Sequence, residues 1–127
     1  MNIIHSLNKS IKRHIQDMQK QTFTKIDFEQ WLDLEQFPGT QILPLAQPIP
    51  KGSIHLLKMK KGVEIPVHTH PSDEYVYVLK GIIKTGEKIC SPGMFWFTPA
   101  YTQQGSHQAI TDVELMTVRL GEMGVFE

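Results

Sequence analysis

The sequence is poor in cysteine, in excess charge and in long apolar runs, and each shortage excludes a class of protein. Its 127 residues contain one cysteine, Cys90, so neither an intrachain disulfide nor a thiolate zinc site can form. Thirteen basic residues balance thirteen acidic ones, and this neutrality argues against nucleic acid as the main partner. No apolar run approaches the roughly 20 residues that a membrane span requires.

The N-terminus also lacks the features of a secretory signal. Residues 1–5 have no basic lead, no continuous apolar stretch and no small-residue cleavage site. Together these shortages predict a cytoplasmic chain, about one domain in size, that makes no contact with membranes. Because cysteine is almost absent, any chemistry has to come from carboxylates and from the six histidines.

The first 39 residues have helical patterns. Residues 1–20 carry apolar side chains at steps of three and four, which predicts an amphipathic helix. A second short helix is predicted for residues 24–37, because Thr24 and Asp27 resemble a capping box and Pro38-Gly39 ends the segment. We therefore expect an N-terminal helical extension, residues 1–39, followed by a main domain, residues 40–127.

From residue 40 onward, prolines and glycines divide the sequence into short pieces with β-type residues and near period-two patterns. The predicted strands are 41–45, 53–59, 63–69, 74–79, 82–85, 88–90, 94–98 and 113–120. Many short strands at even spacing indicate an all-β sandwich or barrel. No 3.6-residue period after residue 40 supports βαβ units.

A metal-binding pattern lies near the middle of the chain. His68 and His70 alternate along a predicted strand, so their imidazoles share one face about 7 Å apart along the backbone. The turn Pro71-Ser72-Asp73 then returns the carboxylate of Glu74 to the same neighbourhood. A lone histidine in a strand is usually just a hydrogen-bonded side chain. Two histidines with this glutamate favour a divalent metal site that suits iron, manganese, nickel, zinc or copper.

The same residues resemble the first motif of the cupin family. Gly62, five residues, His68-Thr69-His70, three residues, Glu74, six residues and Gly81 match that motif at every spacing. The similarity covers about residues 40–120, and it is greatest to the cupin domain of ChrR-type anti-sigma factors and to acetylacetone-cleaving dioxygenases. The resemblance implies an all-β cupin-type barrel, that is, a double-stranded β-helix or jelly roll, with one divalent transition metal per subunit held by the two histidines and the glutamate.

The second cupin motif is altered, which leaves the fourth ligand open. Gly93 and Pro99 stand at the motif spacing, but Tyr101 occupies the expected glycine position and Gln104 the expected histidine position. Gly105-Ser106-His107 resembles the Gly-Ser-x-His turn with a reshaped loop. We predict that His107 and not Gln104 is the fourth ligand, because an imidazole is a better donor to a borderline metal than an amide oxygen. Should His107 face solvent, the three first-motif ligands still form a competent facial set for Fe(II).

The resemblance implies two functions from different classes. In the first, the protein is a metal-dependent, Fe(II)-type dioxygenase or related oxidoreductase acting on a small diketone or phenolic ketone. Iron or zinc is the preferred metal, with manganese and nickel as alternatives, and Glu74 is the candidate catalytic proton shuttle. In the second, the chain is a non-catalytic metal-binding sensor or regulatory module of the ChrR type.

A run of large side chains next to the metal motif predicts a homodimer. Tyr75, Tyr77 and Leu79 alternate with Glu74 and therefore face away from the metal. An exposed apolar strip on a small domain usually marks a protein interface. The alternative is that the N-terminal helix or the segment around Trp31 covers this strip.

The other notable side chains have structural interpretations. Cys90 is interpreted as a small buried hydrophobe. His5, His14 and His55 are interpreted as ordinary surface or partly packed residues. In the strand 94–98, either Met94 with Trp96 or Phe95 with Phe97 lines the interior, and alternation alone does not distinguish the two sets.

Overall fold

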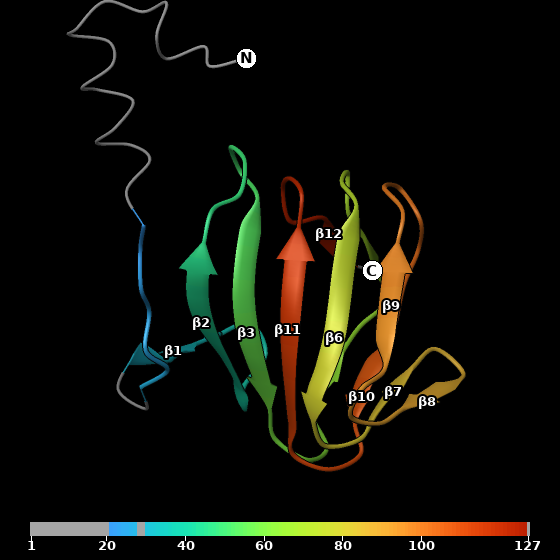
Figure 1. Cartoon of the computed structure of the whole chain (residues 1–127). Coiled ribbons are helices and arrows are strands. Elements are labelled where there is room, and N and C mark those ends of the chain that lie inside the picture. The colour runs from blue at the N-terminus through green and yellow to red at the C-terminus, as the bar shows by residue number, and fades with distance from the viewer. Residues whose placement is uncertain (1–20, 28–29, 127) are drawn as a thin grey trace, which may run out of the picture.

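A computed structural model describes residues 21–27 and 30–126, whose regular structure is almost entirely antiparallel strand (Figure 1). The larger sheet has the order β1 (Leu32–Asp33), β2 (Thr40–Ala46), β3 (Ser53–Met59), β11 (Val113–Arg119), β6 (Glu74–Lys80) and β9 (Phe95–Thr98). The smaller sheet has the order β4 (Glu64–Ile65), β10 (His107–Ala109), β7 (Ile83–Thr85) and β8 (Lys88–Cys90). A further pair joins β12 (Val125–Phe126) to β5 (His68–Thr69). The predicted all-β fold class is confirmed.

The hydrophobic core draws on both sheets. Strand β6 shows why: Val76 and Val78 are buried, whereas Tyr75 and Tyr77 between them are not, because successive side chains of a strand point to opposite faces. The core cluster consists of Met59, Val76, Val78, Val113 and Leu115 from the larger sheet and Ile65, Ile83, Cys90 and Ala109 from the smaller one. The buried position of Cys90 agrees with its interpretation as a small hydrophobe, and burial raises the pKa of its thiol.

Most predicted strands occur close to their predicted bounds. The strands 53–59 and 88–90 match, and 74–79 extends by one residue to Lys80. The strand predicted over 63–69 is interrupted and forms β4 and β5. Pro66 lies between the two pieces, and proline has no N–H to donate to a sheet ladder.

The helix predicted for residues 24–37 is wrong for the described part of that segment. Leu32 and Asp33 form β1, which pairs with β2 at the edge of the larger sheet. Trp31 is buried against Leu43 and Leu56 on the outer face of that sheet. Short helices are marginal on their own, so burial of this indole and edge pairing outweigh the local helical signal.

The helix predicted for residues 1–20, with His5 and His14, lies outside the described residues. The division of the chain at residue 40 therefore stays a prediction. Within the described ranges, no helix has the length and apolar character needed to cross a membrane.

The outward-facing strip of Tyr75, Tyr77 and Leu79 is covered at one end only. Leu79 packs onto the cluster around Trp31, so the segment around Trp31 covers this end of the strip. Tyr77 remains 39% exposed, and Tyr75 stacks on Phe97 with ring centroids 4.9 Å apart. Strand β9 thus presents Phe95 and Phe97 outward, whereas Met94 and Trp96 pack against the core.

Candidate metal centre

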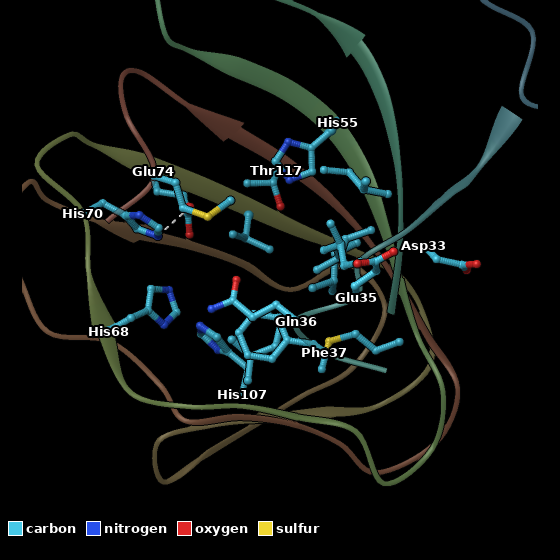
Figure 2. A pocket seen from close by; sticks show the side chains of 18 of the residues that line it. Asp33, Glu35, Gln36, Phe37, His55, His68, His70, Glu74, His107 and Thr117 are labelled. Atoms are coloured by element: carbon cyan, nitrogen blue, oxygen red, sulfur yellow. Dashed lines mark ion pairs between the residues drawn. The ribbon is translucent and has the colours of Figure 1, made fainter. Parts of the chain in front are cut away.

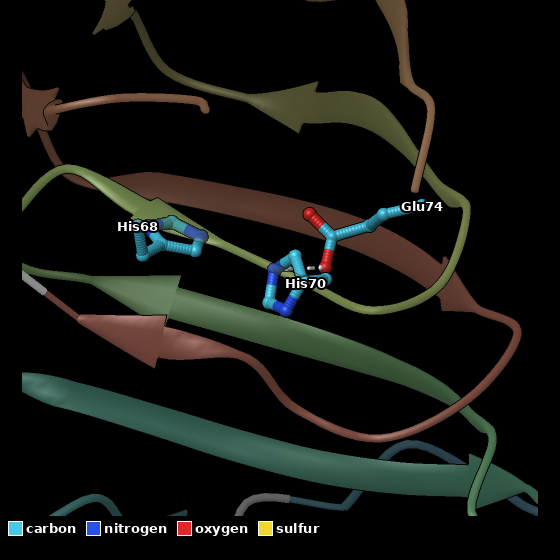
Figure 3. Close-up of side chains that lie close together, drawn as sticks. All are labelled: His68, His70 and Glu74. Atoms are coloured by element: carbon cyan, nitrogen blue, oxygen red, sulfur yellow. Dashed lines mark ion pairs between the residues drawn. The ribbon is translucent and has the colours of Figure 1, made fainter. Parts of the chain in front are cut away.

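The three first-motif side chains converge inside the barrel (Figure 3). His68 lies on β5, His70 follows that strand, and Glu74 opens β6 after the turn between them. Their ligand atoms all lie within 4.8 Å of one another, and each residue is at most 7% exposed. The segment from β5 to the start of β6 therefore brings the predicted donors together.

A backbone carbonyl orients His68. Its Nδ1 donates to the carbonyl oxygen of Pro66 at 2.9 Å, which leaves the lone pair of the neutral ring on Nε2. Burial lowers the pKa of His68, which keeps the ring neutral. A neutral imidazole whose second nitrogen donates to a carbonyl is the usual form of a metal-binding histidine.

His70 and Glu74 face one another. Nε2 of His70 lies 3.0 Å from Oε2 of Glu74, while the N–H of Gly124 donates to Nδ1 of the same ring at 2.9 Å. Although close to this carboxylate, the buried Nε2 has no well-directed hydrogen bond within the described part of the chain. Because Nδ1 accepts the hydrogen bond from Gly124, a neutral His70 carries its proton on Nε2 beside the carboxylate, and a cation between the ring and Glu74 would bind Nε2 only after that proton leaves.

The carboxylate of Glu74 has a second partner. Gln104 donates from Nε2 to Oε1 of Glu74 at 3.2 Å, and its own Oε1 accepts from the hydroxyl of Thr98 at 3.3 Å. Burial alone would raise the pKa of Glu74, but the contacts with His70 and Gln104 outweigh it and lower that pKa. Glu74 is therefore ionised at neutral pH, and its negative charge favours a cation at this end of the barrel.

His107 faces the same interior from β10. Its ring lies 5.3 Å from that of His68 between centroids, and it stacks on Trp96 at 5.8 Å. The hydroxyl of Thr85 lies 3.0 Å from Nδ1, and burial lowers the pKa of His107 to about 4. His107 is not part of the cluster of close ligand atoms that His68, His70 and Glu74 form among the described residues. Its role as fourth ligand stays a prediction, although the side chain is buried beside the site.

These donors lie at one end of a cavity of about 380 Å³ (Figure 2). Its walls are mostly apolar, and the segment Asp33–Phe37 lines it as well. The apolar side chains are Leu34, Phe37, Ile42, Leu57, Met59, Ile65, Val76, Trp96, Leu115 and Met123. A cavity of this size and character, with a few convergent polar groups, suits a small organic molecule.

His55 also lines this cavity, and its interpretation as a surface or partly packed residue was wrong. The side chain is 5% exposed, and Thr117 on the neighbouring strand lies beside it (Figure 2). The period-two pattern could have predicted that His55 is buried, because His55 shares a face of its predicted strand with Leu57 and Met59. Alternation can thus identify a histidine that faces the interior without any metal motif nearby.

Comparisons with known proteins agree with this geometry. A family model, the ChrR cupin-like domain, matches residues 19–124. An acetylacetone dioxygenase from Acinetobacter johnsonii has a similar structure, with a TM-score of 0.72 and 14% identity over 80% of this chain and 75% of that one. KdgF from a Halomonas species has a TM-score of 0.61 and 26% identity over 70% of this chain and 85% of that one.

The anti-sigma factor ChrR of Rhodobacter sphaeroides, solved in complex with SigE, is similar as well. Its TM-score is 0.63 with 18% identity, over 74% of this chain and 51% of the ChrR chain. No curated protein matches the sequence. These likenesses confirm the predicted barrel fold.

Proposed function

The chain belongs to the family of ChrR cupin-like domains, and from that premise we propose that it is a metal-dependent dioxygenase for a small organic substrate. The supporting observation is the convergence of His68, His70 and Glu74 at one end of a largely apolar cavity of about 380 Å³. We assign these three residues as ligands of one divalent ion, with His107 as the fourth. A bound divalent iron would supply Lewis acidity and electrons for the reaction of the substrate with O₂.

The protein's own residues perform the remaining tasks. The apolar walls exclude water from the bound substrate, which strengthens the electrostatic interactions at the site. Glu74 is within reach to move a proton, because Oε2 lies 3.0 Å from Nε2 of His70 while Gln104 holds Oε1. If the histidines alone bind the ion, the carboxylate of Glu74 is free to act as the proton shuttle.

The test is oxygen uptake by the iron-loaded protein with a panel of β-diketones and phenolic ketones. We expect turnover that depends on iron and that is lost in His68→Ala. Metal analysis of protein purified without chelators or a histidine tag reports which ion it acquires. Tight metal retention with no oxygen uptake on any substrate would contradict the dioxygenase proposal.

That last result would favour a second function, a non-catalytic metal-binding module. Its support is the structural likeness to ChrR, which was solved bound to a sigma factor. The chain spans about half of the ChrR chain, so a sigma-factor partner is the weaker of the two assignments.

We also propose that the protein is a homodimer. Tyr75, Tyr77, Phe95 and Phe97 form an outward aromatic patch on β6 and the edge strand β9, and Phe95 is 56% exposed. Exposed aromatic side chains that stack on one another are typical of interfaces. Light scattering should give twice the 14.5 kDa chain mass for the wild type and the chain mass for Phe97→Arg. A wild-type mass of one chain would contradict the dimer.

A further inference from the structure

His55 is a buried histidine that the proposed metal site does not use. It lies on β3 in the wall of the cavity, and its Nδ1 is 2.7 Å from the hydroxyl of Ser53, which fixes the orientation of the ring. No residue in the described part of the chain hydrogen-bonds its Nε2. A polar atom facing an apolar cavity without a partner is costly unless water or a ligand occupies the space.

Thr117 extends this polar spot. It stands directly opposite His55 in the pairing of β11 with β3, and it is opposite Val76 in the pairing of β11 with β6. In Figure 2 both side chains lie on the cavity wall across from His107. The hydroxyl and the imidazole therefore offer adjacent hydrogen-bonding groups on one face of the larger sheet.

The spacing of the strands gives the length of a ligand that reaches both ends. Glu74 is on β6 and His55 is on β3, with β11 between them. Neighbouring strands are about 4.8 Å apart, and Glu74 is opposite Arg119 whereas His55 is opposite Thr117, so the two backbones are separated by roughly 12 Å. The side chains of Glu74 and His55 occupy part of this distance. A ligand that reaches from the metal cluster to His55 therefore needs about the length of a substituted benzene ring.

The surroundings select an uncharged ligand group. Burial lowers the pKa of His55 to about 4, so the ring is neutral at pH 7 and offers no positive charge to a carboxylate. Asp33 and Glu35, which are exposed and also line the cavity, disfavour anions, although the half-buried Arg119 is near enough to His55 to lower the pKa of that ring as well. Leu57 and Leu115 make the wall between the two ends apolar, so burying a charged ligand group against it is costly.

We propose that His55 and Thr117 form a hydrogen-bonding site for an uncharged carbonyl or hydroxyl oxygen at the far end of the substrate. The substrate is then an elongated, largely apolar molecule with oxygen groups at both ends, one at the metal cluster and one at His55. This inference rests on the proposed function and specifies its substrate class. His55 and Thr117 determine specificity and do not hold the metal.

The experiment compares two β-diketones that differ by one hydroxyl group. The probes are 1-phenylbutane-1,3-dione and its 4-hydroxyphenyl analogue, whose diketone chelates a metal while the ring extends away from it. Binding to zinc-loaded protein is measured by calorimetry, because zinc does not change redox state and no turnover intervenes. The wild type should bind the hydroxyl probe about tenfold more tightly than the phenyl probe, which corresponds to one well-formed hydrogen bond.

Two variants test the assignment. In His55→Phe the preference for the hydroxyl probe should fall to about one, and in Thr117→Val it should fall about threefold. Zinc content and the circular dichroism spectrum should stay as in the wild type for both. His55→Gln should recover part of the preference because the amide still offers a hydrogen-bonding group.

The outcomes separate the two proposals. A preference that is unchanged in His55→Phe and in Thr117→Val overturns the inference and leaves the metal site intact. Zinc-loaded wild type that binds neither probe also overturns it. Wild type that retains no zinc contradicts the proposed function itself, and the inference that rests on it fails with it.

Discussion

The two halves of the candidate centre are built in different ways. The first half, residues 68–74, runs from β5 through one turn to the start of β6 and brings three donors within 4.8 Å of one another. In the second half, residues 99–107, the two polar side chains have different surroundings. Gln104 donates to the carboxylate of Glu74, and His107 faces the cavity from β10. The donors of the first half therefore come from one short segment, whereas the second half brings its polar groups to the site from a loop and from a strand of the smaller sheet.

Those partners are visible in the backbone pairing. Gln104 exchanges two backbone hydrogen bonds with His68, at 2.9 and 3.0 Å, which fixes the loop against the first half. His107 stands opposite Ile65 of β4 and Thr85 of β7, so the smaller sheet sets its direction. The second half is thus held by pairing with the first half and with the smaller sheet.

The largest effect should come from the first half. His68→Ala or His70→Ala removes one of the three converging donors, and we expect metal affinity to fall by roughly 100-fold to 1,000-fold, more than loss of a supporting residue costs. Competition with a chromophoric chelator measures the affinity. Gln108→Ala is the control, since this exposed residue is adjacent to His107 on β10. An affinity within a few fold of the wild type would show that residues 68–74 do not bind the metal.

Acid should destabilise the metal-free protein through the second half. Burial lowers the pKa of His107 to about 4 from 6.5, so between these values the unfolded state binds more protons than the folded state. The free energy of unfolding therefore increases as the pH rises from 4 to 6.5. Over this window the His107 ring contributes about 3 kcal/mol, and this contribution disappears as the pH falls.

Urea denaturation of the metal-free wild type and of His107→Gln at pH 7, 5.5 and 4 measures this contribution. The variant should lose less stability between pH 7 and pH 4, although burial of His55 contributes in the same direction in both proteins. Equal losses in the two proteins would mean that His107 is not buried as described.

A glycine from each half provides a stability comparison. Gly81 closes the first motif with φ 81°, and a Cβ there would collide with the carbonyl oxygen of Asp112. Gly93 of the second motif has φ 93°, but a Cβ would meet nothing within 4 Å. Gly81→Ala should therefore cost about 3 kcal/mol of unfolding free energy and Gly93→Ala about 1 kcal/mol, the cost of positive φ alone.

Urea midpoints of the two alanine variants measure the difference. Both substitutions add one methyl group at a turn, so each serves as the control for the other. If both variants lose the same free energy of unfolding, the close approach between Gly81 and Asp112 does not contribute to the cost of the Gly81 substitution.

The smallest effect distinguishes the two candidates for the fourth ligand. His107→Ala should weaken metal binding about tenfold, because an imidazole donor is lost. Gln104→Ala should change it by no more than about threefold, since its amide contacts Glu74 and its removal frees Oε1 without removing a donor. Isothermal titration with zinc measures both. The reverse ranking would assign the fourth position to Gln104.

Most strands and the residues of the first half of the centre could be predicted from the sequence alone. Alternating apolar residues and the glycines and prolines between them are local signals, and they identified most strands within one or two residues. His68, His70 and Glu74 converge because period two and a short turn act over only seven residues. The spacing was enough to predict that these side chains lie near one another, although β5 is held by its pairing with β12 and by the bridge to Gln104.

The other features depend on contacts between segments that are distant in sequence. Trp31 gains more from burial on the outer face of the larger sheet than its segment would gain from a helical turn. Gln104 is aimed at Glu74 by a bridge to His68, and His55 reaches the cavity because β3 lies beside β11. Each of these outcomes depends on strands that are distant in sequence and adjacent in space, and their free energy of burial and pairing exceeds any local preference.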